Sequence, residues 1–234
     1  MISVVISYCN NDFKFIEKNL GEVRKFAKDI IVCYCDYSFD GEQEDPSKIL
    51  QMLEIAKGCN IVKIPYDLDK PDKYHHNLMR WYGIQNAKED YVLFLDADEI
   101  IEGELFNEFL ENYDYKYDVL SLECNWYFRD NRKAKKTEEA GVLCKKSICT
   151  EDYIFSNAER WEFLNRKNLK ITMNFRYKDQ ILCHHYSWAR TKEEMLKKVK
   201  SWGHKNERDW VGLIEEEFSR EFNGTDFVHK YEYE

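Results

Sequence analysis

Two carboxylates stand two positions apart at the end of an apolar run in YVLFLDADEI, residues 91–100. Apolar or aromatic residues at 91–95 precede Asp96, and Asp98 follows after Ala97. On an extended chain, residues two apart point the same way, so both carboxylates are predicted to project from one side of the strand end. Close carboxylates repel each other unless a cation lies between them. Mg²⁺ or Mn²⁺ would relieve this repulsion and would also hold a diphosphate, because hard oxygen ligands suit hard cations.

The same motif has other interpretations. Asp98 could cap a short helix near residue 103 while Asp96 is merely solvated. A calcium loop counted from Asp96 would need Gly at its sixth position and Glu at its twelfth, where this chain has Ile101 and Asn107. The motif also resembles the aspartyl nucleophile of haloacid-dehalogenase phosphatases, but there it ends the first strand of the domain. The divalent-metal interpretation is therefore favoured.

The elements that precede this motif alternate between strand and helix patterns, which is typical of a parallel sheet covered by helices. The periodicity predicts strands at 3–7, 29–34, 61–64 and 91–95, and helices at 13–27, 74–87 and from Pro46 to near Gly58, with Asp45 as cap. Ligands of open α/β sheets bind at the carboxyl edge of the strands. Asp96 and Asp98 are thus predicted to lie at a binding edge.

The pattern changes beyond residue 100. GELFNEFLE predicts a short helix with Glu99 as a carboxylate near its start, and two antiparallel strands are predicted at 118–128 and 142–148. The charged run RDNRKAKK at 129–136 is predicted to be a solvated loop between these strands. At Thr191, the sequence T-K-E-E has the spacing of a capping box, which predicts a helix there.

Length and composition predict one domain. The chain of 234 residues can build one sizeable core, and its three prolines and nine glycines leave little material for linkers. We expect a nucleotide-sugar-binding half at 1–100, an acceptor half at 101–190 and a helical C-terminal extension at 191–234. The fold class is α/β, with a mixed, mainly parallel central sheet flanked by helices.

Charge and cysteine usage restrict partners and location. The net charge of −9 argues against a nucleic-acid surface, which needs a basic footprint. No run reaches the roughly 18 apolar residues of a transmembrane helix, and MISVVISYC is expected to be a strand because it lacks the features of a signal peptide. The eight cysteines are scattered rather than spaced as a disulfide framework, which predicts a cytoplasmic, soluble protein.

The order of these pieces resembles a family 2 glycosyltransferase of the GT-A fold. SVVISYCNN at 3–11 is similar to the family's first strand and turn, with Asn10 matching, and CDYSFDG at 35–41 resembles its D-D-G-S-T-D-G. The resemblance implies that Asn10 and Asp36 contact the donor, with Asp36 at the nucleotide base. Cys35 replaces the first Asp of that pattern, which leaves the identity of the base open.

MRWYGIQNAKEDYVLFLDADE at 79–99 is the strongest match to the family. Arg80 falls on the family's Arg, which implies that it faces the nucleotide or its diphosphate, where a planar bidentate donor is suitable. Asp96 and Asp98 fall on the family's D-x-D. The resemblance implies that Asp98 ligates Mn²⁺ or Mg²⁺, and that Asp96 contacts ribose or sugar and adds to the metal site.

The segment CHHYSWARTKEEMLKKVKSWGHKNERDW at 183–210 is similar to the tail of a subgroup of these enzymes. In many enzymes of this fold a His after the central sheet completes the metal site, and imidazole is a competent ligand. The resemblance implies His185 in this role, with His184 as the alternative. A structural role is expected for His204 in W-G-H.

An inverting family also needs a carboxylate that accepts the proton of the acceptor hydroxyl. Two candidates lie between the D-x-D and the metal His: Glu159 in NAERWEF and Asp152 in CTEDYIF. Glu159 is favoured because an acidic residue shortly before Trp resembles the family's element at this position. A surface ion pair with Arg160 is the alternative role for Glu159.

The resulting hypothesis is a metal-dependent glycosyltransferase that moves a sugar from a nucleotide-diphosphate sugar, favoured as a UDP-sugar, to a glycan or other hydroxyl acceptor, with inversion. A phosphatase with an aspartyl nucleophile and a non-catalytic nucleotide- or glycan-binding module remain as alternatives. Aromatic residues of the second half could stack on sugar faces, although core packing is their more common use. These residues are Trp126, Trp161, Tyr186 and Trp188.

Overall fold

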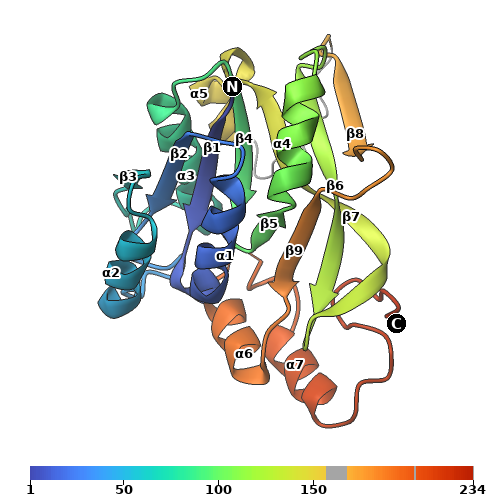
Figure 1. The fold of residues 1–234 in the computed structure, drawn as a ribbon. Coiled ribbons are helices and arrows are strands. Elements are labelled where there is room, and N and C mark those ends of the chain that lie inside the picture. Colours follow the sequence, from blue (N-terminus) through green and yellow to red (C-terminus); the bar gives the residue numbers. More distant parts are fainter. Residues whose placement is uncertain (157–167, 203, 234) are drawn as a thin grey trace.

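The structure, a computed structural model, describes residues 1–156, 168–202 and 204–233. Within these ranges, strands form one curled sheet in the order β3-β2-β1-β4-β7-β6-β9-β5, with β8 beside β6 (Figure 1). The strands are β1 (Ser3–Tyr8), β2 (Asp29–Tyr34), β3 (Asn60–Lys63), β4 (Tyr91–Asp96), β5 (Glu99–Ile101), β6 (Val119–Phe128), β7 (Arg132–Lys145), β8 (Ile171–Phe175) and β9 (Cys183–Trp188).

Helices cover the sheet and one of its ends. They are α1 (Phe13–Val23), α2 (Pro46–Ile55), α3 (Asp72–Asn86), α4 (Gly103–Asn112), α5 (Glu151–Ser156), α6 (Lys192–Ser201) and α7 (Trp210–Phe218), with short 3-10 helices η1 (Asn10–Asp12) and η2 (Lys146–Ile148). Asp45 caps α2 through Ser47, and Thr191 and Glu194 form the predicted capping box of α6. None of the described helices has the length and apolar character needed to cross a membrane.

Strand directions confirm the predicted fold class. The first four strands of the sheet order are parallel neighbours, whereas β7 runs antiparallel to both β4 and β6. β9 is parallel to β6 and antiparallel to β5. The sheet is therefore mixed but mainly parallel, as in nucleotide-binding α/β folds.

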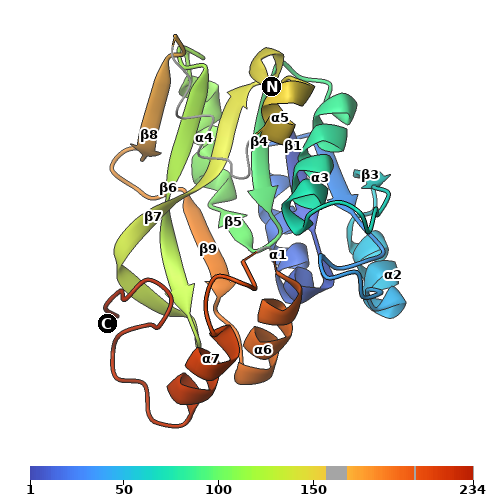
Figure 2. The ribbon, with the colours of Figure 1, turned by 180° about the vertical axis from the view of Figure 1, so that it is seen from behind.

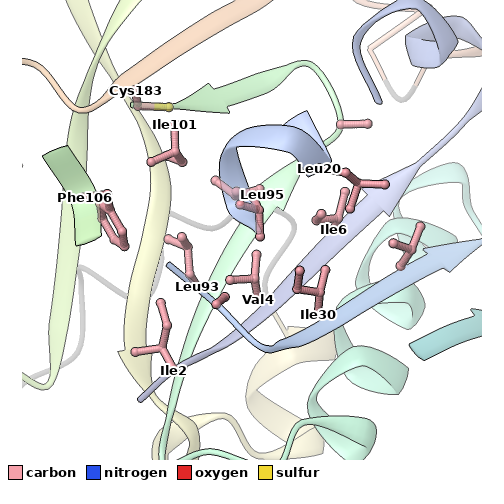
Figure 3. Close-up of a cluster of buried hydrophobic side chains, with 14 of the residues drawn as sticks. Ile2, Val4, Ile6, Leu20, Ile30, Leu93, Leu95, Ile101, Phe106 and Cys183 are labelled. Carbon is pink, nitrogen blue, oxygen red and sulfur yellow. The ribbon is translucent and has the colours of Figure 1, made fainter. Parts of the chain in front are cut away.

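Alternate residues of the buried strands build two cores. Val4, Ile6 and Leu93 face α1 and α4, as Figure 3 shows for that side of the sheet. Val5 and Phe94 face α3 and α5. Because strand side chains alternate between faces, the near-continuous apolar runs of β1 and β4 are what a sheet covered on both sides requires.

The C-terminal helices close one end of the sheet. In both views α6 and α7 lie beyond the carboxyl ends of β1 and β4, whereas α5 lies near the N-terminus at the other end (Figures 1 and 2). An aromatic cluster lies under these helices, with Trp126, Trp188 and Trp210 among its buried members. The predicted C-terminal extension is thus packed against the binding edge of the sheet.

Two local predictions were wrong, and one alternative interpretation is excluded. The run at 129–136 is largely strand, because β7 begins at Arg132 and pairs with β6, although most of its side chains are exposed. Glu99 is not at a helix start: it lies in β5 and is fully buried, and α4 begins only at Gly103. Asp98 does not cap α4, whose N-cap is Glu102. The three-residue β5 is too short to leave a periodic signal in the sequence.

Candidate active site

The turn that carries Asp96 and Asp98 is held by hydrogen bonds from three directions. Asn19 on α1 donates through Nδ2 to the carbonyls of Asp96 and Ala97, each at 3.3 Å, and of Glu99 at 2.7 Å. The Ala97 amide donates to the Ser7 carbonyl of β1 at 3.0 Å. The Asp96 amide donates to the buried Glu99 carboxylate at 2.9 Å. The Glu99 carboxylate therefore helps to hold this turn by accepting a hydrogen bond from the Asp96 amide.

The two oxygens of Asp98 have different neighbours. Oδ2 accepts from Arg190 at 3.1 Å and lies 3.5 Å from Lys198 Nζ, whereas Oδ1 lies 3.7 Å from His185 Nε2. The Asp98 side chain is only 4% exposed. Burial by itself raises the pKa of Asp98, but the charges of Lys198, His185 and Arg190 outweigh it and lower this pKa. Asp98 is thus held as a carboxylate.

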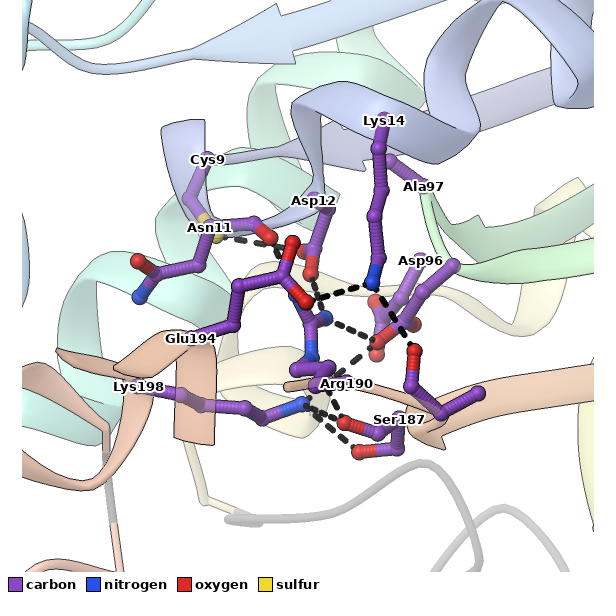
Figure 4. A network of polar contacts seen from close by, with 12 residues as sticks. Cys9, Asn11, Asp12, Lys14, Asp96, Ala97, Ser187, Arg190, Glu194 and Lys198 are labelled. Carbon is purple, nitrogen blue, oxygen red and sulfur yellow. Dashed lines mark hydrogen bonds and ion pairs between the residues drawn. The ribbon is translucent and has the colours of Figure 1, made fainter. Parts of the chain in front are cut away.

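Arg190 joins the first turn of the chain to the end of β9. Its guanidinium is fully buried and donates to Asp12, to the Asn11 carbonyl and to the Ser187 carbonyl (Figure 4). Burial and the charge of Asp98 raise the pKa of Asp12, against the opposing charge of Arg190. Arg190 therefore neutralises two buried carboxylates and holds the first turn of the chain against the end of β9.

Lys198 brings a second cation to this site from α6. Its ammonium group donates to Ser187 Oγ at 2.7 Å and to the Ser187 carbonyl at 3.1 Å. The side chain is 13% exposed and lines the cavity described below. An ammonium group so fixed can meet an anionic ligand without reorganising.

Asp96 belongs to a different cluster. Its Oδ1 lies 3.1 Å from Nε2 of His76 on α3, and the Arg80 guanidinium lies 3.1 Å from the same ring nitrogen. Arg80 also donates to Asn77 Oδ1 at 3.2 Å and is 3% exposed. Asp96 and Arg80 are thus linked through His76.

These groups meet in one cavity of about 480 Å³. Asp96, Asp98, His185, Arg80 and Lys198 all line it. The loop after β2 contributes Tyr37, Ser38 and Phe39, and the C-terminal part contributes Trp202, His204, Glu207, Arg208, Trp210, Val228 and His229. A cavity of this size that combines cations and carboxylates suits a small charged organic ligand.

A sequence profile described as glycosyl transferase family 2 matches residues 3–194, which contain every strand described above. The chain belongs to glycosyl transferase family 2. This family implies a nucleotide-sugar donor, and it overturns the phosphatase alternative for the D-x-D motif. Search of curated protein sequences found no match.

Solved structures share the fold of this family 2 chain. S. aureus TarS 1-349 matches with a TM-score of 0.50 and 14% identity over 94% of this chain and 72% of that one. S. aureus TarS also matches with a TM-score of 0.51 and 14% identity over 85% and 38%. The bifunctional IspDF from Campylobacter jejuni has a TM-score of 0.49 and 15% identity over 84% and 53%. The family 2 chain spans about half of the IspDF chain and 38% of the second TarS chain, and the TarS matches show a shared fold alone.

The Asp98 and His185 side chains fit a divalent cation. Asp98 Oδ1 and His185 Nε2 lie 3.7 Å apart, too far for a hydrogen bond, and they are an oxygen and a nitrogen donor of the kinds that divalent ions bind. Arg190 and Lys198 occupy only the other oxygen of Asp98. Among the described residues no third His, Cys, Asp or Glu joins them in a ligand cluster. Donor phosphates and water would therefore supply the remaining positions, as is usual for Mg²⁺.

The donor residues expected in the first half have unequal positions. Arg80 and Asp96 line the cavity, whereas Asn10 and Asp36 do not. Asn10 is buried and donates through Nδ2 to the Asp45 carbonyl at 2.9 Å, so it ties two loops together. Asp36 forms an ion pair with Lys63 of β3. Asp36 was expected at the nucleotide base. The cavity is lined instead by the three residues that directly follow it, Tyr37, Ser38 and Phe39.

The remaining candidates lie apart from this cavity or outside the described residues. Asp152 lies in α5, which follows the strand end paired with Tyr91 at the start of β4, so it is at the opposite end of β4 from Asp96. Glu159 lies outside the described residues. His184 faces away: its ring nitrogens lie 2.6 Å from Glu102 Oε1 and 2.8 Å from the Tyr127 hydroxyl. The structure thus brings His185, not His184, to Asp98.

Sequence reasoning missed His76, Arg190 and Lys198 as site residues. His76 and Arg80 are four apart on α3, which places them on one helix face and could have linked them. Arg190 and Lys198 stand within the tail motif that identified His185. Their ion pairs with Asp98 span about a hundred residues, and no local pattern reports such contacts.

Proposed function

We propose that this family 2 chain is a metal-dependent glycosyltransferase that moves a sugar from a UDP-sugar to a hydroxyl acceptor with inversion. The observation that supports this most directly is the meeting of Asp98 and His185 with Lys198 and Arg80 in one cavity. A carboxylate–imidazole pair for a cation, next to fixed positive side chains, suits a diphosphate leaving group.

Each group in the cavity has a proposed task. Asp98 and His185 would hold Mn²⁺ or Mg²⁺, which when bound supplies Lewis-acid stabilisation of charge on the diphosphate. Lys198 and Arg80 would bind phosphate oxygens. Asp96, which faces His76 rather than the metal pair, would accept hydrogen bonds from hydroxyls of the ribose or the sugar.

The proposed step is one displacement at the anomeric carbon. The acceptor oxygen forms the new bond as the bond to the leaving phosphate oxygen breaks, and the diphosphate departs with the electron pair. Glu159 remains the proposed base that takes the acceptor proton. Asp152 is not part of this proposal, because it lies at the other end of β4.

A thermal-shift panel of UDP-, GDP-, dTDP- and CMP-sugars with and without Mn²⁺ tests the donor. A ligand that binds only the native state raises Tm by mass action, here by about 5–10 °C at about 100 times Kd. We expect the largest rise with a UDP-sugar and Mn²⁺ together, and loss of the Mn²⁺-dependent part in His185→Gln. A full rise without Mn²⁺, or no rise with any donor, would contradict the proposal.

A further inference from the structure

A second group of polar side chains lines the same cavity and has no task in the donor site. Glu138 comes from β7, and His204, Glu207 and His229 come from the segments that flank α7. His229 Nε2 lies 3.5 Å from Glu138 Oε1, and His204 Nδ1 lies 2.5 Å from Glu207 Oε1. The cavity thus carries two imidazole–carboxylate pairs besides Asp98–His185 and Asp96–His76.

The histidine of each pair packs against a tryptophan of the aromatic cluster under the C-terminal helices. The His229 ring meets Trp126 edge-on at 5.0 Å, and the His204 ring meets Trp202 edge-on at 4.9 Å. Trp126 also meets His185 edge-on at 5.0 Å. A single indole therefore connects one of these pairs to the proposed metal site.

The segment that carries His229 is fixed against β7. The buried carboxylate of Asp226 accepts from the amides of His229 at 2.6 Å and Tyr231 at 3.0 Å. Burial and the neighbouring Glu138 carboxylate raise the pKa of the Tyr231 hydroxyl. Asp226 therefore holds the turn that carries His229, the partner of Glu138 on the wall of the cavity.

These side chains remain accessible to a ligand. The exposed fractions are 40% for His229, 37% for His204 and 54% for Glu207, while Glu138 keeps 18%. Carboxylates accept hydrogen bonds from hydroxyl groups, and imidazoles can donate or accept them. The two carboxylates also disfavour an anionic ligand. The matching ligand is uncharged and carries several hydroxyl groups.

We propose that the Glu138–His229 and Glu207–His204 pairs form the acceptor subsite, and that the acceptor is a neutral saccharide. This inference rests on the proposed function, because it names the substrate that receives the sugar. It also assigns three of the four subsite residues to the C-terminal segment, beyond the 101–190 range predicted for the acceptor half.

Saturation-transfer NMR with the full chain, diamagnetic Mg²⁺ and UDP tests the subsite. The probes are p-nitrophenyl glycosides of glucose and galactose, with the glycoside of glucuronic acid as the charged contrast. We expect a neutral glycoside to bind the wild type and to bind Glu138→Gln and Glu207→Gln at least fivefold more weakly. Glu139→Gln is the matched control: Glu139 neighbours Glu138 on β7 but accepts from the Asn174 amide and is not among the cavity residues. Its affinity should equal that of the wild type.

Several results would overturn the subsite. These are absence of neutral-glycoside binding, equal binding by the wild type and both variants, or equal binding of the glucuronide. If Glu138→Gln lowers Tm, His229→Gln takes its place, because that side chain is largely exposed. The UDP-sugar thermal shift, measured in parallel, separates the two proposals: donor binding without glycoside binding contradicts the subsite alone, and the reverse contradicts the donor assignment.

Discussion

At the scale of single residues, the two carboxylates of the D-x-D motif contact different side chains of one cavity. Asp98 lies among Arg190, Lys198 and His185, whereas Asp96 faces His76. The two carboxylates were predicted to share one cation because they are two apart on an extended chain. The strand ends at Asp96, and the turn that follows directs Asp98 toward the end of β9.

Lys198 provides a residue-scale prediction. Replacing Lys198 with Met removes a fixed positive charge beside Asp98, so we expect the pKa of Asp98 to rise and the Kd for UDP to increase about tenfold, or about 1.4 kcal/mol. Isothermal titration calorimetry at pH 7 measures this Kd. Lys200→Met, an exposed change on the same helix, is the control. Equal Kd values for the two variants would exclude Lys198 from phosphate binding.

Asn19 provides a second residue-scale prediction. It is fully buried, and its side-chain amide serves three carbonyls of the D-x-D turn. Asn19→Ala leaves those carbonyls without this donor, so the free energy of unfolding should fall by about 2–3 kcal/mol. Urea denaturation measures the change, with Asn107→Ala, at a half-buried position outside the turn, as control. A loss below about 0.5 kcal/mol would mean that Asn19 does not hold the turn.

At the scale of elements, α3 approaches β1 closely at Gly83. A Cβ at this position would lie 2.3 Å from Cγ1 of Val5, a distance that real Cβ atoms do not show. Gly83→Ala should therefore force α3 from the sheet and lower the free energy of unfolding by about 1–3 kcal/mol. Gly21→Ala on α1, where an added Cβ would meet no atom within 4 Å beyond its neighbours and its own helix backbone, should instead stabilise by about 0.5–1 kcal/mol. Thermal denaturation compares the two, and destabilisation of similar size in both would contradict the close approach.

Glu22 joins α1 to α4 and predicts a pH dependence. Its burial raises its pKa, but hydrogen bonds from Lys25, Lys18 and the Gly103 amide outweigh this and lower the pKa to about 2. A lowered folded-state pKa stabilises the protein above the ordinary value of 4.5, and this stabilisation is lost as pH falls from about 4.5 to 2.

Glu22→Gln should therefore cost about 1–2 kcal/mol at pH 7, after allowance for the exposed lysines. The difference from the wild type should shrink as pH falls below about 4.5. Urea denaturation at pH 7, 5 and 3 measures it. A difference that stays constant over this range would show that the ionised carboxylate is not the stabilising group.

Elements with a strong periodic pattern were predictable from the sequence. The apolar runs indicated where β1, β2 and β4 lie, and the capping box indicated where α6 begins. β5 was not predictable, because its short run is defined by pairing with β9. The start of β7 was missed because exposed lysines there resemble a loop, although the strand is held by its ladder to β6.

At the scale of the whole molecule, the candidate site depends on contacts between distant segments. Arg80, Asp96, Asp98 and His185 could be proposed from motifs, and all four line the cavity. Lys198 and Glu138 were not proposed, because packing of the C-terminal part against the sheet edge brings them there. The structure therefore adds residues of β7, of α6 and of the segments that flank α7 to the predicted site.

The central claim is that Asp98 makes donor cleavage depend on a metal. Release of UDP from a UDP-sugar, measured with and without Mn²⁺ in the wild type and in Asp98→Asn, tests it most directly, with circular dichroism to verify the fold of the variant. We expect Mn²⁺-dependent release by the wild type and a rate at least about 100-fold lower in Asp98→Asn, or about 2.7 kcal/mol in activation free energy. Release that is independent of Mn²⁺, or equal in the two proteins, would contradict it.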